Sequence, residues 1–143
     1  MELQARSYIH IQRPVSEVFD AVRDPRKLEQ FFVTEASAPL EAGSTVRWVW
    51  GDMKAGADVM VIEVVRNEKI TIRWEGGENM ETMVTLTFAE VEKGTRVEVV
   101  EDGWPKTVEG IHSYGNNMQG WANFLVCLKA FVEHGINLRK GAF

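Results

Sequence analysis

The sequence is poor in the residues that build cross-links and metal sites. It has one cysteine, Cys127, so it can form neither an intramolecular disulfide nor a cysteine-rich metal site. Its three histidines, His10, His112 and His134, lie far apart, and no two of them have the spacing of a metal-ligand pair. Phosphate-binding glycine motifs and the nucleophile elbow of hydrolases are also missing. We therefore expect no metal and no cofactor, and we expect Cys127, in an apolar helical segment, to be a buried small side chain.

Two further shortages bear on location and partners. No run approaches the ~18 apolar residues of a membrane span, and residues 1–10 lack the apolar segment and cleavage site of a signal peptide. Basic residues are outnumbered, because 16 lysines and arginines face 21 aspartates and glutamates, a net charge of −5. Nucleic acid and anionic lipid are attracted by a positive surface. We expect a cytoplasmic protein with no nucleic-acid partner and no membrane span.

The length of the chain is sufficient for one hydrophobic core. Its 143 residues fall within the roughly 100–200 of an ordinary domain. Apolar residues make up 45% and charged residues 26%, as in soluble globular proteins. We find no linker, low-complexity tract or internal repeat. The sequence therefore predicts a single domain over residues 1–143.

Hydrophobic periodicity divides the chain into strands and helices. Residues 3–12 alternate between apolar and polar side chains and predict a strand. A short helix over 16–22 follows, and Asp24-Pro25 is a typical start of a second one. After a weak strand at 34–38, strongly alternating segments recur with short turns between them, at 45–50, 57–66, 70–75, 80–91 and 95–102. Strands joined by such short loops pair as antiparallel neighbours.

The C-terminal part has a helical period. From about Thr107 to Gly135, apolar residues recur every three or four positions, namely Ile111, Tyr114, Met118, Trp121, Leu125, Leu128 and Val132. The predicted fold is α+β, a helix-grip arrangement. In it a curled antiparallel sheet of six or seven strands lies around a long C-terminal helix, and two short helices follow the first strand.

This order resembles the START-like (SRPBCC, helix-grip) superfamily. Three segments carry the resemblance, namely residues 13–28, the Gly43-x-x-x-Arg47-Trp48 strand, and residues 120–133 from Gly-Trp-Ala-Asn-Phe onward. Within the superfamily the chain is most similar to the bacterial branch related to the C-terminal domain of the heat-shock protein 90 ATPase activator. The resemblance implies a cavity between sheet and long helix, closed by the two short helices, and it implies no shared catalytic residue.

Five tryptophans are many for a chain of this length. Alternation places Trp48, Trp50 and Trp74 on inward strand faces, Trp121 lies on the apolar face of the long helix, and Trp104 lies in the loop before it. Core packing would explain each one singly. Together they would form an aromatic-walled pocket, which is a common lining of small-molecule sites.

Two acidic residues lie at alternating strand positions that also place apolar neighbours on the inward face of the sheet. If Glu63 faces water, alternation turns Met60 inward and Asp58 with it, and Glu101 has the parity of Val99. A buried carboxylate is costly unless it is paired or hydrogen-bonded. Two alternatives stay open. Strand ends or bulges let both acids reach solvent, or the acids are polar anchors at the mouth of a cavity.

The favoured function is the binding of a small apolar or aromatic molecule in a cavity between sheet and helix. The predicted wall and anchor residues are Trp48, Trp50, Asp58, Met60, Trp74, Glu101, Trp104, Tyr114, Met118 and Trp121. No catalytic residue and no metal ligand is predicted. One alternative is a stress-response module with a chaperone as its partner. Another is a cyclase- or hydrolase-type enzyme, which would need a titratable pair in the cavity.

Overall fold

The N-terminal elements of the computed structural model, which describes residues 2–143, follow the predicted order. Strand β1 (Gln4–Ile11) leads into helix α1 (Val15–Arg23), helix α2 (Pro25–Leu28) and the two-residue strand β2 (Glu35–Ala36). The carboxylate of Asp24 accepts a hydrogen bond from the backbone N–H of Arg26 at 2.8 Å, which caps α2 as expected for Asp followed by Pro.

The remaining strands form hairpins in chain order. They are β3 (Thr45–Trp50), β4 (Ala55–Val65), β5 (Lys69–Gly77), β6 (Met80–Val91) and β7 (Gly94–Asp102), with a short 3-10 turn, η1 (Gly51–Met53), between β3 and β4. Within residues 2–143 the strands make one seven-stranded sheet in the order β1-β7-β6-β5-β4-β3-β2. Every neighbouring pair is antiparallel, which confirms the predicted α+β fold.

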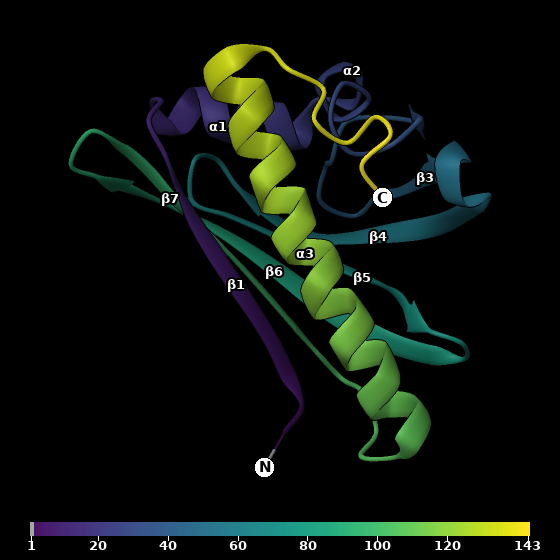
Figure 1. The fold of residues 1–143 in the computed structure, drawn as a ribbon. Helices are drawn as coiled ribbons and strands as arrows, with labels where there is room; N and C mark the ends of the chain where they lie inside the picture. Colours follow the sequence, from purple (N-terminus) through teal and green to yellow (C-terminus); the bar gives the residue numbers. More distant parts are fainter. Residues whose placement is uncertain (1) are drawn as a thin grey trace.

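The long helix α3 (Val108–His134) begins and ends where the sequence indicates. The hydroxyl of Thr107 accepts a hydrogen bond from the backbone N–H of Gly110 at 3.0 Å, and Gly135 ends the helix in the left-handed conformation at φ 67°. Figure 1 shows α3 lying across the curled sheet, with α1 and α2 near its C-terminal end. A continuous core joins the helices to the sheet, and its largest members include Trp48, Phe19 and Phe124.

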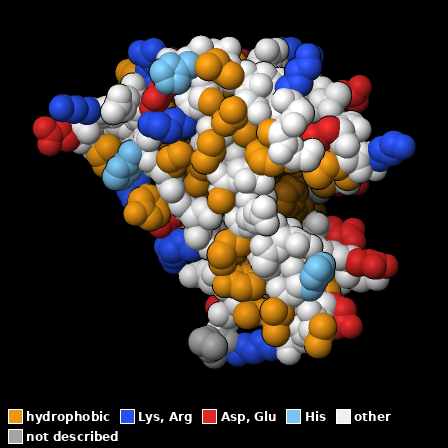
Figure 2. Space-filling view, in the orientation of Figure 1, with side chains coloured by type: hydrophobic (Ala, Val, Ile, Leu, Met, Phe, Trp, Pro, Cys, Tyr) orange, Lys and Arg blue, Asp and Glu red, His pale blue; other side chains and the backbone are white. Residues whose placement is uncertain are grey.

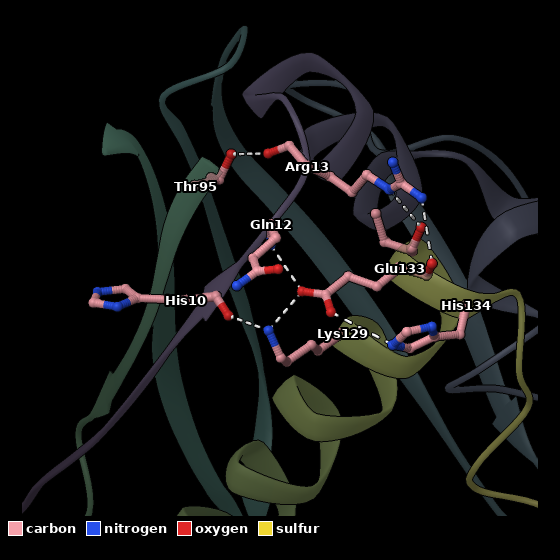
Figure 3. Close-up of polar contacts among 8 residues, drawn as sticks. His10, Gln12, Arg13, Thr95, Lys129, Glu133 and His134 are labelled. Atoms are coloured by element: carbon pink, nitrogen blue, oxygen red, sulfur yellow. Dashed lines mark hydrogen bonds and ion pairs between the residues drawn. The ribbon is translucent and has the colours of Figure 1, made fainter. Parts of the chain in front are cut away.

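Polar contacts attach the C-terminal end of α3 to the end of β1 (Figure 3). The carboxylate of Glu133 accepts hydrogen bonds from the backbone N–H of Gln12 at 2.8 Å and from Lys129 at 2.5 Å. Lys129 also donates to the carbonyl of His10 at 2.8 Å. Burial raises the pKa of the Glu133 carboxyl, but these hydrogen bonds and the charges of Lys129 and His134 outweigh it, so the net pKa is lowered.

Cys127 is buried at 1% exposure, as predicted. Burial raises the pKa of its thiol, and the positive charge of Arg139 opposes this rise. The side chain packs in the core as a small hydrophobic group.

The predicted orientation of the fourth strand is wrong. In β4 the side chains of Val59 and Val61 are buried, whereas Met60 is 47% exposed and Asp58 is also exposed. The pairing of β4 with β5 shifts between Val61 and Glu63, which marks a β-bulge. The predicted orientation of Met60 and Asp58 is obtained by counting back from Glu63, on the other side of this bulge. A shift of one residue turns every preceding side chain to the other face of the sheet.

The first turns of α3 also differ from prediction. Ile111 was expected on the buried stripe but is 52% exposed. Apart from Gly110, the buried side of α3 consists of residues from Trp121 onward, namely Trp121, Phe124, Leu125, Cys127 and Leu128. The apolar spacing at the start of the helix therefore includes a side chain that does not enter the core.

Candidate functional site

A pocket of about 410 Å³ lies beside α3. Its apolar walls come from the sheet, from α3, from the segment after α2 and from the C-terminal segment, and consist of Phe32, Trp50, Met53, Ala55, Trp74, Trp121 and Phe143. Figure 2 shows this hollow beside the long helix, with hydrophobic side chains at its bottom. The volume and the apolar walls are those of a small-molecule site.

The remaining lining is polar and comes mostly from α3. It consists of Gly120 and five polar residues, Asn116, Asn117, Gln119, Asn123 and Arg139. Within the described chain, Arg139 is the only lining residue with a charged side chain. The pocket therefore combines aromatic walls, neutral hydrogen-bonding groups and one cation.

The aromatic walls form a continuous cluster of rings. The ring centroid of Trp74 lies 6.1 Å from that of Trp50, 6.0 Å from that of Trp48 and 5.5 Å from that of Trp121. Phe32 packs edge-on against Trp50 with a centroid distance of 5.4 Å. Aromatic rings at such centroid distances attract one another, and this packing restricts the rotamers of the wall side chains.

The carboxylate of Glu101 holds two of these rings in place. It is fully buried, and it accepts hydrogen bonds from Trp121 Nε1 at 2.7 Å and from Trp74 Nε1 at 2.9 Å. The hydroxyl of Thr82 at 2.6 Å and the amide of Asn117 at 3.1 Å complete the set of donors. An ionised carboxylate only accepts hydrogen bonds, so these four donors match its lone pairs. With no exposed surface, Glu101 is placed to orient the rings and not to exchange a proton with a ligand.

Gly76 in β5 allows this close packing. A Cβ on Gly76 would collide with the hydroxyl of Thr82 and would lie 2.6 Å from Glu101 Oε2. The carbonyl of Gly76 accepts hydrogen bonds from Trp104 Nε1 at 3.0 Å and from the amide of Asn117 at 3.2 Å. One glycine therefore lets β5, β6, β7 and α3 share a single polar centre.

The described residues contain no cluster of three or more His, Cys, Asp or Glu side chains that could hold a metal ion. Over residues 2–143, no helix has the length and hydropathy needed to cross a bilayer.

The arrangement of one curled antiparallel sheet packed around one long helix is also found in known proteins. The family model described as "Activator of Hsp90 ATPase homolog 1-like protein" matches residues 12–133. The chain belongs to this family. The resemblance inferred from the sequence is therefore confirmed. A search of curated proteins finds no match.

Solved structures share the fold of this family member. The protein SSP2350 from Staphylococcus saprophyticus is 26% identical with a TM-score of 0.82, over 95% of this chain and 96% of that chain. DynU16, from the dynemicin biosynthetic locus, is 26% identical with a TM-score of 0.85 over 95% of this chain, which spans 49% of DynU16. The Aha1 dimer from Colwellia psychrerythraea shares the fold at 20% identity and a TM-score of 0.78, over 92% of this chain and 97% of that chain.

In this family member, three of the predicted site residues line the pocket, namely Trp50, Trp74 and Trp121. Trp48 and Glu101 are buried and contact the lining residue Trp74. The prediction that Glu101 shares the inward face of Val99 is correct, because both are buried.

Three further predicted residues lie elsewhere on or before α3. Trp104 is 5% exposed and packs edge-on against Tyr114 with a centroid distance of 5.7 Å. Neither belongs to the pocket lining, and neither does the half-buried Met118. Trp104, predicted as a residue of the pocket wall, is instead packed away from the pocket.

Asp58 and Met60 lie on the outer face of the sheet because of the bulge in β4. The carboxylate of Asp58 pairs with Arg47 at 3.1 Å on that face. The expectation that Met60 faces inward is wrong, and for Asp58 the alternative in which a bulge lets the acid reach solvent is the one that the structure shows. Of the two acids considered together, only Glu101 points into the fold.

Several lining residues were not predicted. The carboxamides of Asn116, Asn117 and Gln119 belong to a conspicuously polar run in the sequence, which was a signal for a hydrated or ligand-binding face. Arg139 and Phe143 carried no such signal, because they follow α3 and reach the pocket only when the chain turns back after Gly135. The two short helices, expected to close the cavity, contribute no lining residue within their bounds.

Proposed function

We propose that this protein binds a small, mostly apolar ligand with an aromatic part in the pocket beside α3. The observation that carries the proposal is the set of indole walls around a space of about 410 Å³, with two of the rings oriented by Glu101. Preorganised aromatic walls favour binding because little side-chain freedom is lost when a ligand enters.

The exposure of the lining supports the same function. Met53 and Phe143, at the edge of the pocket, are 55% and 56% exposed. When a ligand covers large apolar side chains that were in contact with water, the complex is stabilised by about 25 cal/mol per Å² of apolar area removed from water. The similarity to DynU16, a protein of a biosynthetic locus, is a second support for a role with a small molecule.

Gly120 offers a direct test. It lines the pocket, and a Cβ added there meets no atom within 4 Å, so a leucine would extend into open space without strain. We expect the wild-type protein to bind the neutral probe N-phenyl-1-naphthylamine with one site, and Gly120→Leu to bind it roughly tenfold more weakly or worse, a loss of ~1.4 kcal/mol or more. Probe fluorescence and tryptophan quenching measure this affinity.

Gly115→Leu is the matched control. Gly115 is also an interior glycine of α3 with no atom within 4 Å of an added Cβ, but it does not line the pocket. Both substitutions raise helix propensity by a similar amount, up to ~1 kcal/mol. Gly115→Leu should bind the probe like the wild type. No binding by the wild type, or equal binding by both variants, would contradict the proposed function.

A second candidate is an interaction module with a chaperone as its partner. Membership of the family and two exposed apolar side chains on β4, Met60 at 47% and Ile62 at 41%, favour it. A titration with the cognate heat-shock protein 90 tests it, with Met60→Ser as the variant expected to weaken binding. No measurable association would exclude this candidate.

The enzyme hypothesis requires an acid–base pair facing the substrate. Among the described residues, Arg139 is the only ionisable side chain of the lining, so the lining holds no such pair. We therefore base no proposal on turnover.

A further inference from the structure

The pocket contains an incompletely satisfied cation. The side chain of Arg139 is 14% exposed and lines the pocket. Its Nε atom lies 3.3 Å from the carboxylate of Asp52, and its guanidinium group is 5.5 Å from the ring of Phe143. Within residues 2–143 no acceptor forms a hydrogen bond with its two terminal amino groups.

The terminal amino groups of this half-buried guanidinium are open to a ligand. Arginine carries five N–H donors in a planar fork, and only the Nε side has an anionic neighbour here. The terminal amino groups can therefore donate to a ligand, and a pair of oxygens in the plane of the fork makes two parallel charge-assisted hydrogen bonds with them. A ligand carboxylate supplies such a pair.

The surrounding groups also favour an acid. No Asp or Glu lines the pocket in the described part of the chain, and both oxygens of the buried Glu101 are already occupied by protein donors. The other polar lining groups are carboxamides, which are neutral. The amide of Asn117 is engaged with Glu101, whereas those of Gln119 and Asn123 form no hydrogen bond within residues 2–143.

We propose that the ligand is an aromatic carboxylic acid, with its rings against Trp50, Trp74 and Trp121 and its carboxylate on the free side of Arg139. This proposal rests on the proposed function and specifies the class of ligand. Aromatic amines and neutral aromatic molecules of the same size would bind more weakly, because they leave the terminal amino groups of Arg139 without an anionic partner.

The test compares two probes of the same size and ring system, the anionic 2-naphthoate and the neutral 2-naphthamide, by calorimetric titration at neutral pH. A hydrogen bond to a charged group contributes about 1.5–3 kcal/mol, so the wild type should bind the acid roughly 10- to 100-fold more tightly than the amide. In Arg139→Met the preference for the acid over the amide should disappear. Arg139→Lys, which keeps the charge but not the fork, should retain part of the preference.

Arg96→Met is the matched control, since it removes one positive charge at a residue outside the pocket lining, stacked on Tyr8 at 4.3 Å. It should leave the acid-to-amide ratio unchanged. Equal affinity of the wild type for acid and amide would overturn this inference and leave the proposed function standing. Binding of neither these probes nor the neutral naphthylamine would overturn both. The wild-type ratio decides the question even where a variant fails to fold, which circular dichroism detects.

Discussion

At the scale of single residues, Glu101 is the most consequential side chain in the structure. A fully buried carboxylate without a basic partner is costly in an apolar core. Here four neutral donors from β5, β6 and α3 replace the water that the carboxylate has lost. Two of these donors are indole N–H groups, which cannot accept a hydrogen bond and therefore need the carboxylate.

Glu101→Gln should destabilise the protein by about 1–3 kcal/mol, the cost of leaving a buried donor unsatisfied. The amide places an N–H₂ group where an oxygen now accepts from Trp74 or Trp121, so one indole loses its acceptor. Urea unfolding measures the change in the free energy of unfolding.

Glu98→Gln is the control on the same strand. Glu98 forms ion pairs with Arg6 at 2.9 Å and Arg96 at 3.3 Å, and the arginines are 52% and 35% exposed. Such pairs contribute up to ~1 kcal/mol. If the two substitutions lower the free energy of unfolding equally, the hydrogen bonds around Glu101 contribute no more to stability than a surface ion pair.

At the scale of elements, the attachment of α3 to β1 depends on Glu133. The pKa of this carboxyl is lowered in the folded protein, because hydrogen bonds from Gln12 and Lys129 outweigh the effect of burial. A lowered folded pKa means that the stabilisation is complete above the unfolded pKa of about 4.3 and is lost as pH falls through the folded value.

The Glu133→Gln variant isolates this contribution. At pH 7 we expect the wild type to be more stable than the variant by about 1–2 kcal/mol, because the neutral amide keeps an acceptor oxygen and so loses only part of the roughly 1.5–3 kcal/mol of a charged hydrogen bond. The difference should shrink as pH is lowered from about 5 to 3, because the wild-type carboxylate becomes protonated. Urea unfolding of both proteins across this range measures it. A difference that does not change with pH would contradict this account.

The bulge in β4 is a feature that the alternation of apolar and polar residues does not predict. A period of two is preserved on each side of the irregularity, but the register shift between Val61 and Glu63 reverses the face. Nothing in the local sequence marks this point, since Ile62 is apolar and yet 41% exposed. The ends of α3 were predictable in contrast, because Thr107 and Gly135 are local signals that act within one turn.

At the scale of the whole molecule, one core includes residues from the helices and from most of the sheet. The ring of Phe32, after α2, lies 4.7 Å from that of Phe124 in α3 and 5.4 Å from that of Trp48 in β3. Elements that share such contacts lose them together when any one of them unfolds. The prediction of a single domain over residues 1–143 is consistent with this continuity and is open to the following test.

The single-domain prediction is tested by equilibrium unfolding. Circular dichroism at 222 nm follows mainly α3, and tryptophan emission follows the cluster around Trp74. We expect both signals to change with the same denaturant midpoint and the same slope, as in a two-state transition. Separate midpoints would show that the sheet and the helix unfold independently, and would contradict a single cooperative domain.

The sequence alone determined the fold class, the order of the elements and the approximate ends of α3, because each depends on local periodicity or on signals a few residues apart. Only the tertiary structure decided where the pocket lies and which side chains line it. The rings of Trp50, Trp74 and Trp121 come from three elements, and Arg139 joins them after the chain reverses at Gly135. Contacts between distant segments depend on strand register and on the path of the chain after the helix. A bulge of one residue or a single turn alters these features without leaving a repeating pattern in the sequence.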